Sequence, residues 1–227
     1  MSEVTLLIHD LAAAVTPVGT GPLRGREFGA LHIHSPASIA VAGDRIFAVG
    51  PPAEIMQKIP TGTDYDSVDG RGKAALPGLI DCHTHAAFLG DRAGEFELRS
   101  SGGDYEEIHA SGGGIRSTVR ATRAGSEEDL RSSVERHLGW MLEHGTTTAE
   151  AKSGYGLDRE TEMKSLRAIQ DAGRRSPVDV YPTFLGAHTV PPEFDSAAEY
   201  VEFVIHEVLP EAALLARSAD VFLERGS

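Results

Sequence analysis

The chain has 227 residues, of which 41% are hydrophobic, so it has room for one large or two small globular domains. Its formal net charge of −13 at pH 7 argues against nucleic acid or an anionic membrane as a partner, because both bind basic surfaces, and favours a small solute. The single cysteine, Cys82, excludes a disulfide within the chain and a cysteine-based zinc site.

The start of the chain, MSEVTLLIHD, has no basic segment of the kind that begins a secretory signal. No run of residues approaches the roughly 18 apolar residues that a membrane-spanning helix needs. We therefore expect a cytoplasmic protein with no membrane partner.

Residues 1–73 are predicted to be rich in β-structure. Strands are expected at residues 4–8, 37–42 and 45–49, and Gly43 with Asp44 forms the turn of a hairpin between the last two. Residues 16–29 contain glycine and proline without clear periodicity, which indicates a loop. Gly50, Pro51 and Pro52 are expected to end the hairpin.

A second region begins with an apolar strand at residues 74–80 that leads directly into His83 and His85. The apolar run is typical of a strand buried on both faces in a parallel sheet. Alternate strand residues share a face, which places the two Cβ atoms roughly 6 to 7 Å apart. Two imidazoles at that separation can bind one metal ion. Cys82 should face the other side and pack in the barrel.

The chain contains another His-x-His pair, His32 and His34, which serves as a comparison. Residues 31–34 alternate apolar and polar side chains, as in a half-exposed strand. We expect these two histidines to face solvent, so spacing alone does not predict a metal site.

The remainder of the chain alternates predicted helices and strands. Strands are expected at residues 146–151, 178–185 and 219–223, with Asp220 near the start of the last one. Ser126 and Asp129 resemble a capping box before a helix that stops at Gly145, and a second helix covers residues 158–172. A third helix is capped by Ser196 and Glu199, and Pro210 should break or restart it. This order predicts parallel strands with helical crossovers.

Polar residues gather after each predicted strand. His83 and His85 follow the first, Lys152 and Tyr155 the second, and His188 the third. Because the carboxyl ends of parallel barrel strands meet on one rim, these side chains should form one site.

Several motifs resemble those of known protein families. The segments AVAGDRIFAVG and DGRGKAALPGLIDCHTH resemble the start of the metal-dependent amidohydrolase superfamily, and GDRAGEFELR, GGGIRSTVRATR, KSGYGL and FLGAHTVPPEF resemble the imidazolonepropionase family. The resemblance implies an α/β fold in two domains. Residues 1–73 would form part of a small β-sandwich domain, and residues 74–227 part of a (β/α)8 TIM-like barrel.

The family resemblance also implies an activity, namely hydrolysis of the ring of 4-imidazolone-5-propanoate to N-formimidoyl-L-glutamate in histidine degradation, with water activated by a metal. His83 and His85 would hold one divalent ion, zinc or iron. Arg92, Tyr155 and His188 would contact the substrate, and His188 is also the candidate catalytic residue. Some amidohydrolases bridge two metals with a modified lysine, but the family pattern uses one metal.

Each substrate residue also has a purely structural alternative. Arg92 can pair with the propanoate carboxylate, or instead form a surface ion pair with Glu95 or Glu97. Tyr155 lies between two glycines that let the backbone approach a ligand, but it could be a packed core tyrosine. His188 could bond the imidazolone ring or the metal, or be a structural histidine. Lys152 is interpreted as part of a loop or as a residue that supports the site.

The resemblance is incomplete in one respect. The family pattern needs a further histidine and an aspartate as ligands and a glutamate as proton carrier, and about 150 residues after Ala74 are too few for a complete barrel. We therefore expect the chain to match the N-terminal half of the enzyme and to be inactive alone, with a homodimer at full length. The alternatives are another amidohydrolase, such as a nucleobase deaminase or a dihydropyrimidinase-like enzyme, or a non-catalytic half-barrel.

Overall fold

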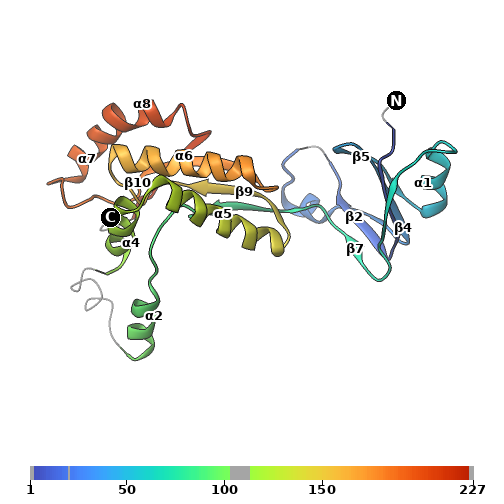
Figure 1. Cartoon of the computed structure of the whole chain (residues 1–227), viewed down its shortest axis with the longest axis horizontal. Helices are drawn as coiled ribbons and strands as arrows, with labels where there is room; N and C mark the ends of the chain where they lie inside the picture. Colours follow the sequence, from blue (N-terminus) through green and yellow to red (C-terminus); the bar gives the residue numbers. More distant parts are fainter. Residues whose placement is uncertain (1–2, 20, 103–112, 225–227) are drawn as a thin grey trace. The chain divides into compact units, whose positions relative to one another are not determined.

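The computed structural model describes residues 3–19, 21–102 and 113–224 (Figure 1). The chain divides into two compact units, Met1–Pro77 and Gly78–Ser227. Strand β7 (Ala74–Ala75) pairs with β2 (Ala13–Pro17), so these two residues belong to the first unit and not to the barrel strand that follows.

The first unit contains two sheets. One has the strand order β5-β4-β1-β6, and its strands are β1 (Leu6–Leu11), β4 (Ala37–Ala42), β5 (Arg45–Gly50) and β6 (Asp66–Asp69). The other has the order β3-β2-β7, with β3 at Leu31–His34. Apolar residues from β1 and β4 fill the two cores, among them Leu7, Ala40, Leu11 and Ile39.

The predicted hairpin is confirmed, since β4 and β5 pair antiparallel from Ser38 with Gly50 to Ala42 with Arg45. The prolines after it do more than end the strand. Pro52 begins helix α1 (Pro52–Lys58), because its fixed φ suits the first helical position, and Ile55 of this helix is fully buried. Part of the predicted 16–29 loop is a short 3-10 helix, η1 (Gly25–Gly29).

The second unit is built on a parallel sheet of strand order β11-β10-β9-β8. Its strands are β8 (Leu79–Thr84), β9 (Thr146–Lys152), β10 (Asp179–Ala187) and β11 (Ser218–Val221). All three strand pairings are parallel, as the alternation of helices and strands predicts for part of a barrel. The carboxyl ends of β8, β9 and β10 therefore lie along one edge of the unit.

Helices connect these strands. They are α2 (Ala93–Ser100), α4 (Ile115–Ala124), α5 (Glu127–Glu143), α6 (Arg159–Arg175), α7 (Ala197–Phe203), the π-helix η2 (Val204–Val208) and α8 (Leu209–Ala212). The predicted capping box is confirmed, because Ser126 and Asp129 bond each other's backbone N–H. Pro210 restarts the last helix after the π-turn. Residues 103–112, between α2 and α4, lie outside the described residues.

The main core joins α5 and α6 to β9. Its buried residues include Leu130, Val134 and Leu138 of α5, Ala149 and Ala151 of β9, and Ile169 of α6. Among the described residues, no helix combines the length and the apolar character needed to cross a membrane.

The prediction of one continuous strand at residues 74–80, buried on both faces, is wrong. Pro77, which has no N–H to donate, separates β7 from β8. Leu79 and Ile80 are 56% and 71% exposed, because β8 is an edge strand with β9 as its neighbour in the described sheet. For the same reason Cys82 is exposed and does not pack in the interior.

Candidate metal and substrate site

His83 and His85 lie at the carboxyl end of β8, as predicted. Their ring centroids are 5.3 Å apart. Thr84 between them points the other way and is buried, and its hydroxyl donates to the carbonyl oxygen of Glu150 in β9 at 2.6 Å. This bond fixes the end of β8 against the next strand, so the two imidazoles emerge together on the opposite side.

One nitrogen of this pair has no protein partner. His85 Nδ1 is buried and makes no hydrogen bond. Burial lowers the pKa of His85 to about 4, and the neighbouring His188 and His83 add to the effect. The ring is therefore neutral at pH 7, and a neutral imidazole with an unused nitrogen fits a metal ligand.

His188 follows β10 and stacks on His85, with ring centroids 5.1 Å apart. Its Nδ1 lies 2.8 Å from the carbonyl oxygen of Gly154, which can only accept a hydrogen bond. Nδ1 therefore carries a proton, which leaves Nε2 of the neutral ring as an acceptor. Burial lowers the pKa of His188 and favours that neutral form.

Tyr155 comes from the loop after β9 and completes an aromatic cluster. Its ring centroid lies 5.7 Å from that of His85 and 5.3 Å from that of His188. Burial raises the pKa of Tyr155, while the charge of Arg92 opposes the shift. The phenol is thus a neutral group that can donate and accept hydrogen bonds beside the histidines.

Arg92 and Tyr155 line the same cavity, of about 480 Å³, whose walls also include Phe88, His137 and Trp140. The Arg92 guanidinium forms an ion pair with Glu95, with Nε 2.6 Å from Oε2. The structural alternative predicted for Arg92 is thus present, while 49% of its side chain remains exposed.

Lys152 is buried and lies in an ion-pair network. Its Nζ is 2.5 Å from Glu150 Oε1 and 3.0 Å from Asp220 Oδ2, which joins β9 to β11. Burial disfavours the lysine charge, but the bonds to both carboxylates raise its pKa overall. The Glu150 carboxylate also accepts the backbone N–H of Thr84, so the network supports the strand that carries the two histidines.

Two carboxylates near this site were not predicted from the sequence. Glu150 precedes Lys152 by two residues, so strand periodicity places both on one face. Glu162 shares a helix face with Leu166 and Ile169, and a charged residue on an apolar helix face is a readable signal. Glu150 bonds Lys152 and the backbone of Thr84, and Glu162 bonds the backbone of the loop that carries Tyr155.

The described residues do not form a complete metal centre around these histidines. In the described ranges, neither His83 nor His85 belongs to a group of three His, Cys, Asp or Glu residues whose ligand atoms all lie within 4.8 Å of one another. The group that does meet this spacing is His9, Asp10 and Asp69 in the first unit, of which the two aspartates are exposed.

No protein-family model matches the chain. An imidazolonepropionase from Rubrobacter xylanophilus is 74% identical over 227 residues, covering 100% of this chain and 55% of that protein. An imidazolonepropionase from Symbiobacterium thermophilum is 47% identical over 230 residues, covering 100% of this chain and 54% of that protein. The chain is homologous to the N-terminal half of imidazolonepropionases. It spans about half the length of the curated relatives it matches.

Two solved structures have a fold similar to that of this chain. E. coli guanine deaminase matches with a TM-score of 0.57 and 16% identity, over 88% of this chain and 43% of that one. An atrazine chlorohydrolase from Arthrobacter aurescens, complexed with zinc, matches with a TM-score of 0.51 and 17% identity, over 95% of this chain and 46% of that one. The predicted partial (β/α) barrel fold is confirmed.

Proposed function

We propose that the chain supplies the N-terminal half of an active site that hydrolyses 4-imidazolone-5-propanoate to N-formimidoyl-L-glutamate, a step of histidine degradation. The observation that carries the proposal is the cluster of His85, Tyr155 and His188. These residues follow three successive barrel strands, and their ring centroids lie 5.1 to 5.7 Å apart. Identity of 74% to an imidazolonepropionase supports the choice of substrate.

A zinc or iron ion fits the proposal, with His83 and His85 as two of its ligands. The buried, unpartnered Nδ1 of His85 supports this assignment. When bound, such an ion would supply activated water and polarise the ring carbonyl. The Lys152 network holds the end of β8 and so keeps the two imidazoles together.

The substrate residues have distinct proposed roles. Arg92 would bind the propanoate carboxylate through two parallel N–H bonds. Tyr155 and the acceptor Nε2 of His188 would orient the imidazolone ring, whose own N–H can donate to that nitrogen. Water adds to the ring carbonyl carbon, the carbon–nitrogen bond breaks, and the departing nitrogen takes the proton.

Two further aspects remain predictions. The family resemblance predicts that the full-length enzyme is a homodimer, which size-exclusion chromatography of a full-length relative would test. The sequence predicts a cytoplasmic location, which cell fractionation would test.

The proposal is tested by completing the barrel. The full chain is co-expressed with the part of the Rubrobacter xylanophilus protein that lies beyond the aligned residues, and the product is called the reconstituted complex. We expect it to form N-formimidoyl-L-glutamate, detected by mass spectrometry, and to contain metal. The control carries His83→Ala and His85→Ala together. Turnover of a purine or dihydropyrimidine without turnover of imidazolonepropanoate would contradict the proposal.

The chain by itself should show neither turnover nor tight metal binding. Two histidines are half of the usual four-ligand shell, and β8 and β11 both present unpaired edges in the described sheet. Elemental analysis and light scattering of the isolated chain check this expectation. A monodisperse monomer with one tightly bound metal and measurable turnover would show that the missing ligands lie within this chain.

A further inference from the structure

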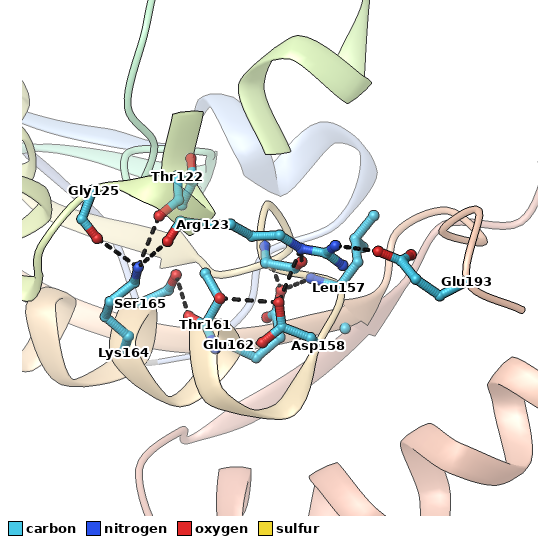
Figure 2. Close-up of polar contacts among 12 residues, drawn as sticks. Thr122, Arg123, Gly125, Leu157, Asp158, Thr161, Glu162, Lys164, Ser165 and Glu193 are labelled. Atoms are coloured by element: carbon cyan, nitrogen blue, oxygen red, sulfur yellow. Dashed lines mark hydrogen bonds and ion pairs between the residues drawn. The ribbon is translucent and has the colours of Figure 1, made fainter. Parts of the chain in front are cut away.

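Glu162, in the first turn of α6, is a buried carboxylate that the proposed reaction does not use. Its side chain is 1% exposed. Oε2 accepts the backbone N–H of Gly154 at 3.0 Å, and Oε1 accepts those of Gly156 and Leu157 at 2.9 Å each. Figure 2 shows Glu162 beneath the loop of residues 154–157, close to Leu157 and Asp158. The carboxylate therefore binds the backbone on both sides of Tyr155.

The loop contains two residues with positive φ, which glycine tolerates and leucine does not favour. Gly154 has φ +111°, and the non-glycine residue Leu157 has φ +58°. A Cβ on Gly156 would lie 2.7 Å from the backbone nitrogen of Glu162, so this glycine packs directly on the helix. Backbone in sparsely populated regions persists when its surroundings hold it, and here the partners are the oxygens of Glu162.

A second charged residue holds the opposite side of the same loop. Arg123 of α4 donates from Nε to the carbonyl oxygen of Gly156 at 2.7 Å, and its guanidinium also pairs with Asp158 and Glu193 (Figure 2). Gly156 is thus bonded through its N–H to Glu162 and through its carbonyl to Arg123. These two bonds hold the two peptide planes on either side of the Gly156 Cα, the first of which directly follows Tyr155.

Gly154 connects the buried carboxylate to the aromatic cluster. Its N–H donates to Glu162, and its carbonyl accepts from Nδ1 of His188 at 2.8 Å. Movement of this one residue would displace both Tyr155, its neighbour in sequence, and His188, its hydrogen-bond partner. The two side chains have ring centroids 5.3 Å apart.

We infer that Glu162 is a positioning residue that keeps the side chains of Tyr155 and His188 in the relative position in which they bind the substrate. This inference rests on the proposed function, because it assigns the two side chains to the same ring-binding site. Glu162 touches neither substrate nor metal. It acts through the backbone of residues 154–157, where three N–H groups converge on one carboxylate.

Glu162→Gln is the sharpest variant, because it keeps the shape of the side chain and replaces one acceptor oxygen by an NH2 donor. That donor must face at least one backbone N–H of the loop. Glu160→Gln is the matched control, since Glu160 is exposed on the same turn of the same helix. Leu138→Ala, in the core of α5, controls for loss of stability elsewhere.

The variants are compared in the reconstituted complex by hydrogen exchange of residues 153–158 and by steady-state kinetics. We expect Glu162→Gln to exchange these amides at least about tenfold faster than Glu160→Gln. It should also reduce kcat/KM, by up to about a hundredfold, because a displacement of about 1 Å can have an effect of that size. Leu138→Ala should lower the melting temperature without a local exchange effect at 153–158.

Unchanged exchange at residues 153–158 in Glu162→Gln, or an equal loss of kcat/KM in Leu138→Ala at matched melting temperature, would overturn the inference. If Glu162→Gln does not fold, Glu162→Asp takes its place, because the shorter side chain keeps the charge but withdraws it from the loop amides. Slow exchange at residues 153–158 together with full kcat/KM in Glu162→Asp would also overturn the inference. The exchange measurement is independent of the substrate. A complex with loop protection but no turnover of imidazolonepropanoate would therefore contradict the proposed function alone.

Discussion

Two segments after neighbouring strands carry proposed substrate residues, and they are organised in opposite ways. The loop at residues 153–157 after β9 is short, and a buried carboxylate binds three of its N–H groups. The segment after β8 presents Arg92 at the surface, in an ion pair with Glu95. Tyr155 is thus fixed in advance, whereas Arg92 already has a partner that a substrate carboxylate must replace.

The difference indicates a division of labour within the proposed site. A ring near the breaking bond needs accurate placement, because small displacements there are costly. A carboxylate remote from that bond needs an accessible cation, and an exposed ion pair is weak enough to exchange. The comparison therefore predicts that changes in the β9 loop impair the reaction itself and the stability of the fold, whereas changes around Arg92 act mainly on KM.

The largest effect should come from a glycine-to-alanine change in the β9 loop, which can be compared with a matched change in the segment after β8. Gly154→Ala forces an L side chain into φ +111°, with its Cβ 2.8 Å from the carbonyl oxygen of Leu185. We expect a loss of about 1 to 3 kcal/mol in stability and up to about a hundredfold in kcat/KM.

The matched change in the other segment is Gly94→Ala in α2, where an added Cβ meets no atom within 4 Å. Alanine favours a helix, so this variant should be as stable as the parent or more so, by at most about 1 kcal/mol. Denaturant unfolding and kinetics of the reconstituted complex check both changes. Similar behaviour of the two variants would remove the contrast.

Arg92→Ala should raise KM far more than it lowers kcat, because the propanoate carboxylate is remote from the breaking bond. A hydrogen bond between charged groups contributes roughly 1.5 to 3 kcal/mol, so KM should increase about ten- to a hundredfold. Arg71→Ala, whose ion pair with Asp69 lies in the first unit, is the control and should leave KM unchanged. An unaltered KM in Arg92→Ala would remove this residue from the site.

The sequence predicted the parts of the fold that depend on local signals. The turn at Gly43, the capping box at Ser126 and the helix restart at Pro210 all depend on neighbouring residues, and all are found. The burial of Leu79 and Ile80 was predicted wrongly, because burial of an edge strand depends on which strands lie beside it. No local pattern supplies that information.

The candidate site shows the same limit. Periodicity and strand order predict that His83, His85, Tyr155 and His188 lie at one sheet edge, and their rings are close together. The partners of their backbone could not be read in the same way. Glu162 binds a loop that precedes it in sequence, and the geometry of that contact depends on the φ angles of Gly154 and Leu157.

A smaller effect should follow from releasing Arg92. Glu95→Gln removes the negative charge from the ion pair and keeps an acceptor for the N–H of Gly114 and the hydroxyl of Ser117. A partly exposed ion pair contributes about 0.2 to 1 kcal/mol, so KM should fall by at most about fivefold while kcat stays the same. Glu97→Gln, a neighbouring exposed glutamate, serves as the control. A rise in KM would indicate that Glu95 holds Arg92 in place for the substrate.

The smallest effect concerns the two organising carboxylates, whose pKa values are shifted in opposite directions. Burial raises the pKa of Glu162 above its usual value of 4.5, and the bonds from Ser153 and the loop amides only partly oppose this. Burial also acts to raise the pKa of Glu95, but the bonds from Arg92, Gly114 and Ser117 lower it overall. Glu95 therefore contributes stability above about pH 4.5 that is lost as the pH falls below that value.

Glu162 has the opposite sign. Its contribution is fully present below the pKa of the unfolded chain and is lost as the pH rises through the higher pKa of the folded state. The melting temperature of the parent should therefore decline relative to that of Glu162→Gln as the pH increases from about 4.5 to 8, since glutamine does not titrate. Glu95→Gln should instead differ from the parent mainly by losing less stability on acidification. Parallel melting curves for the parent and Glu162→Gln across this range would show that the loop amides offset the burial of the carboxylate completely.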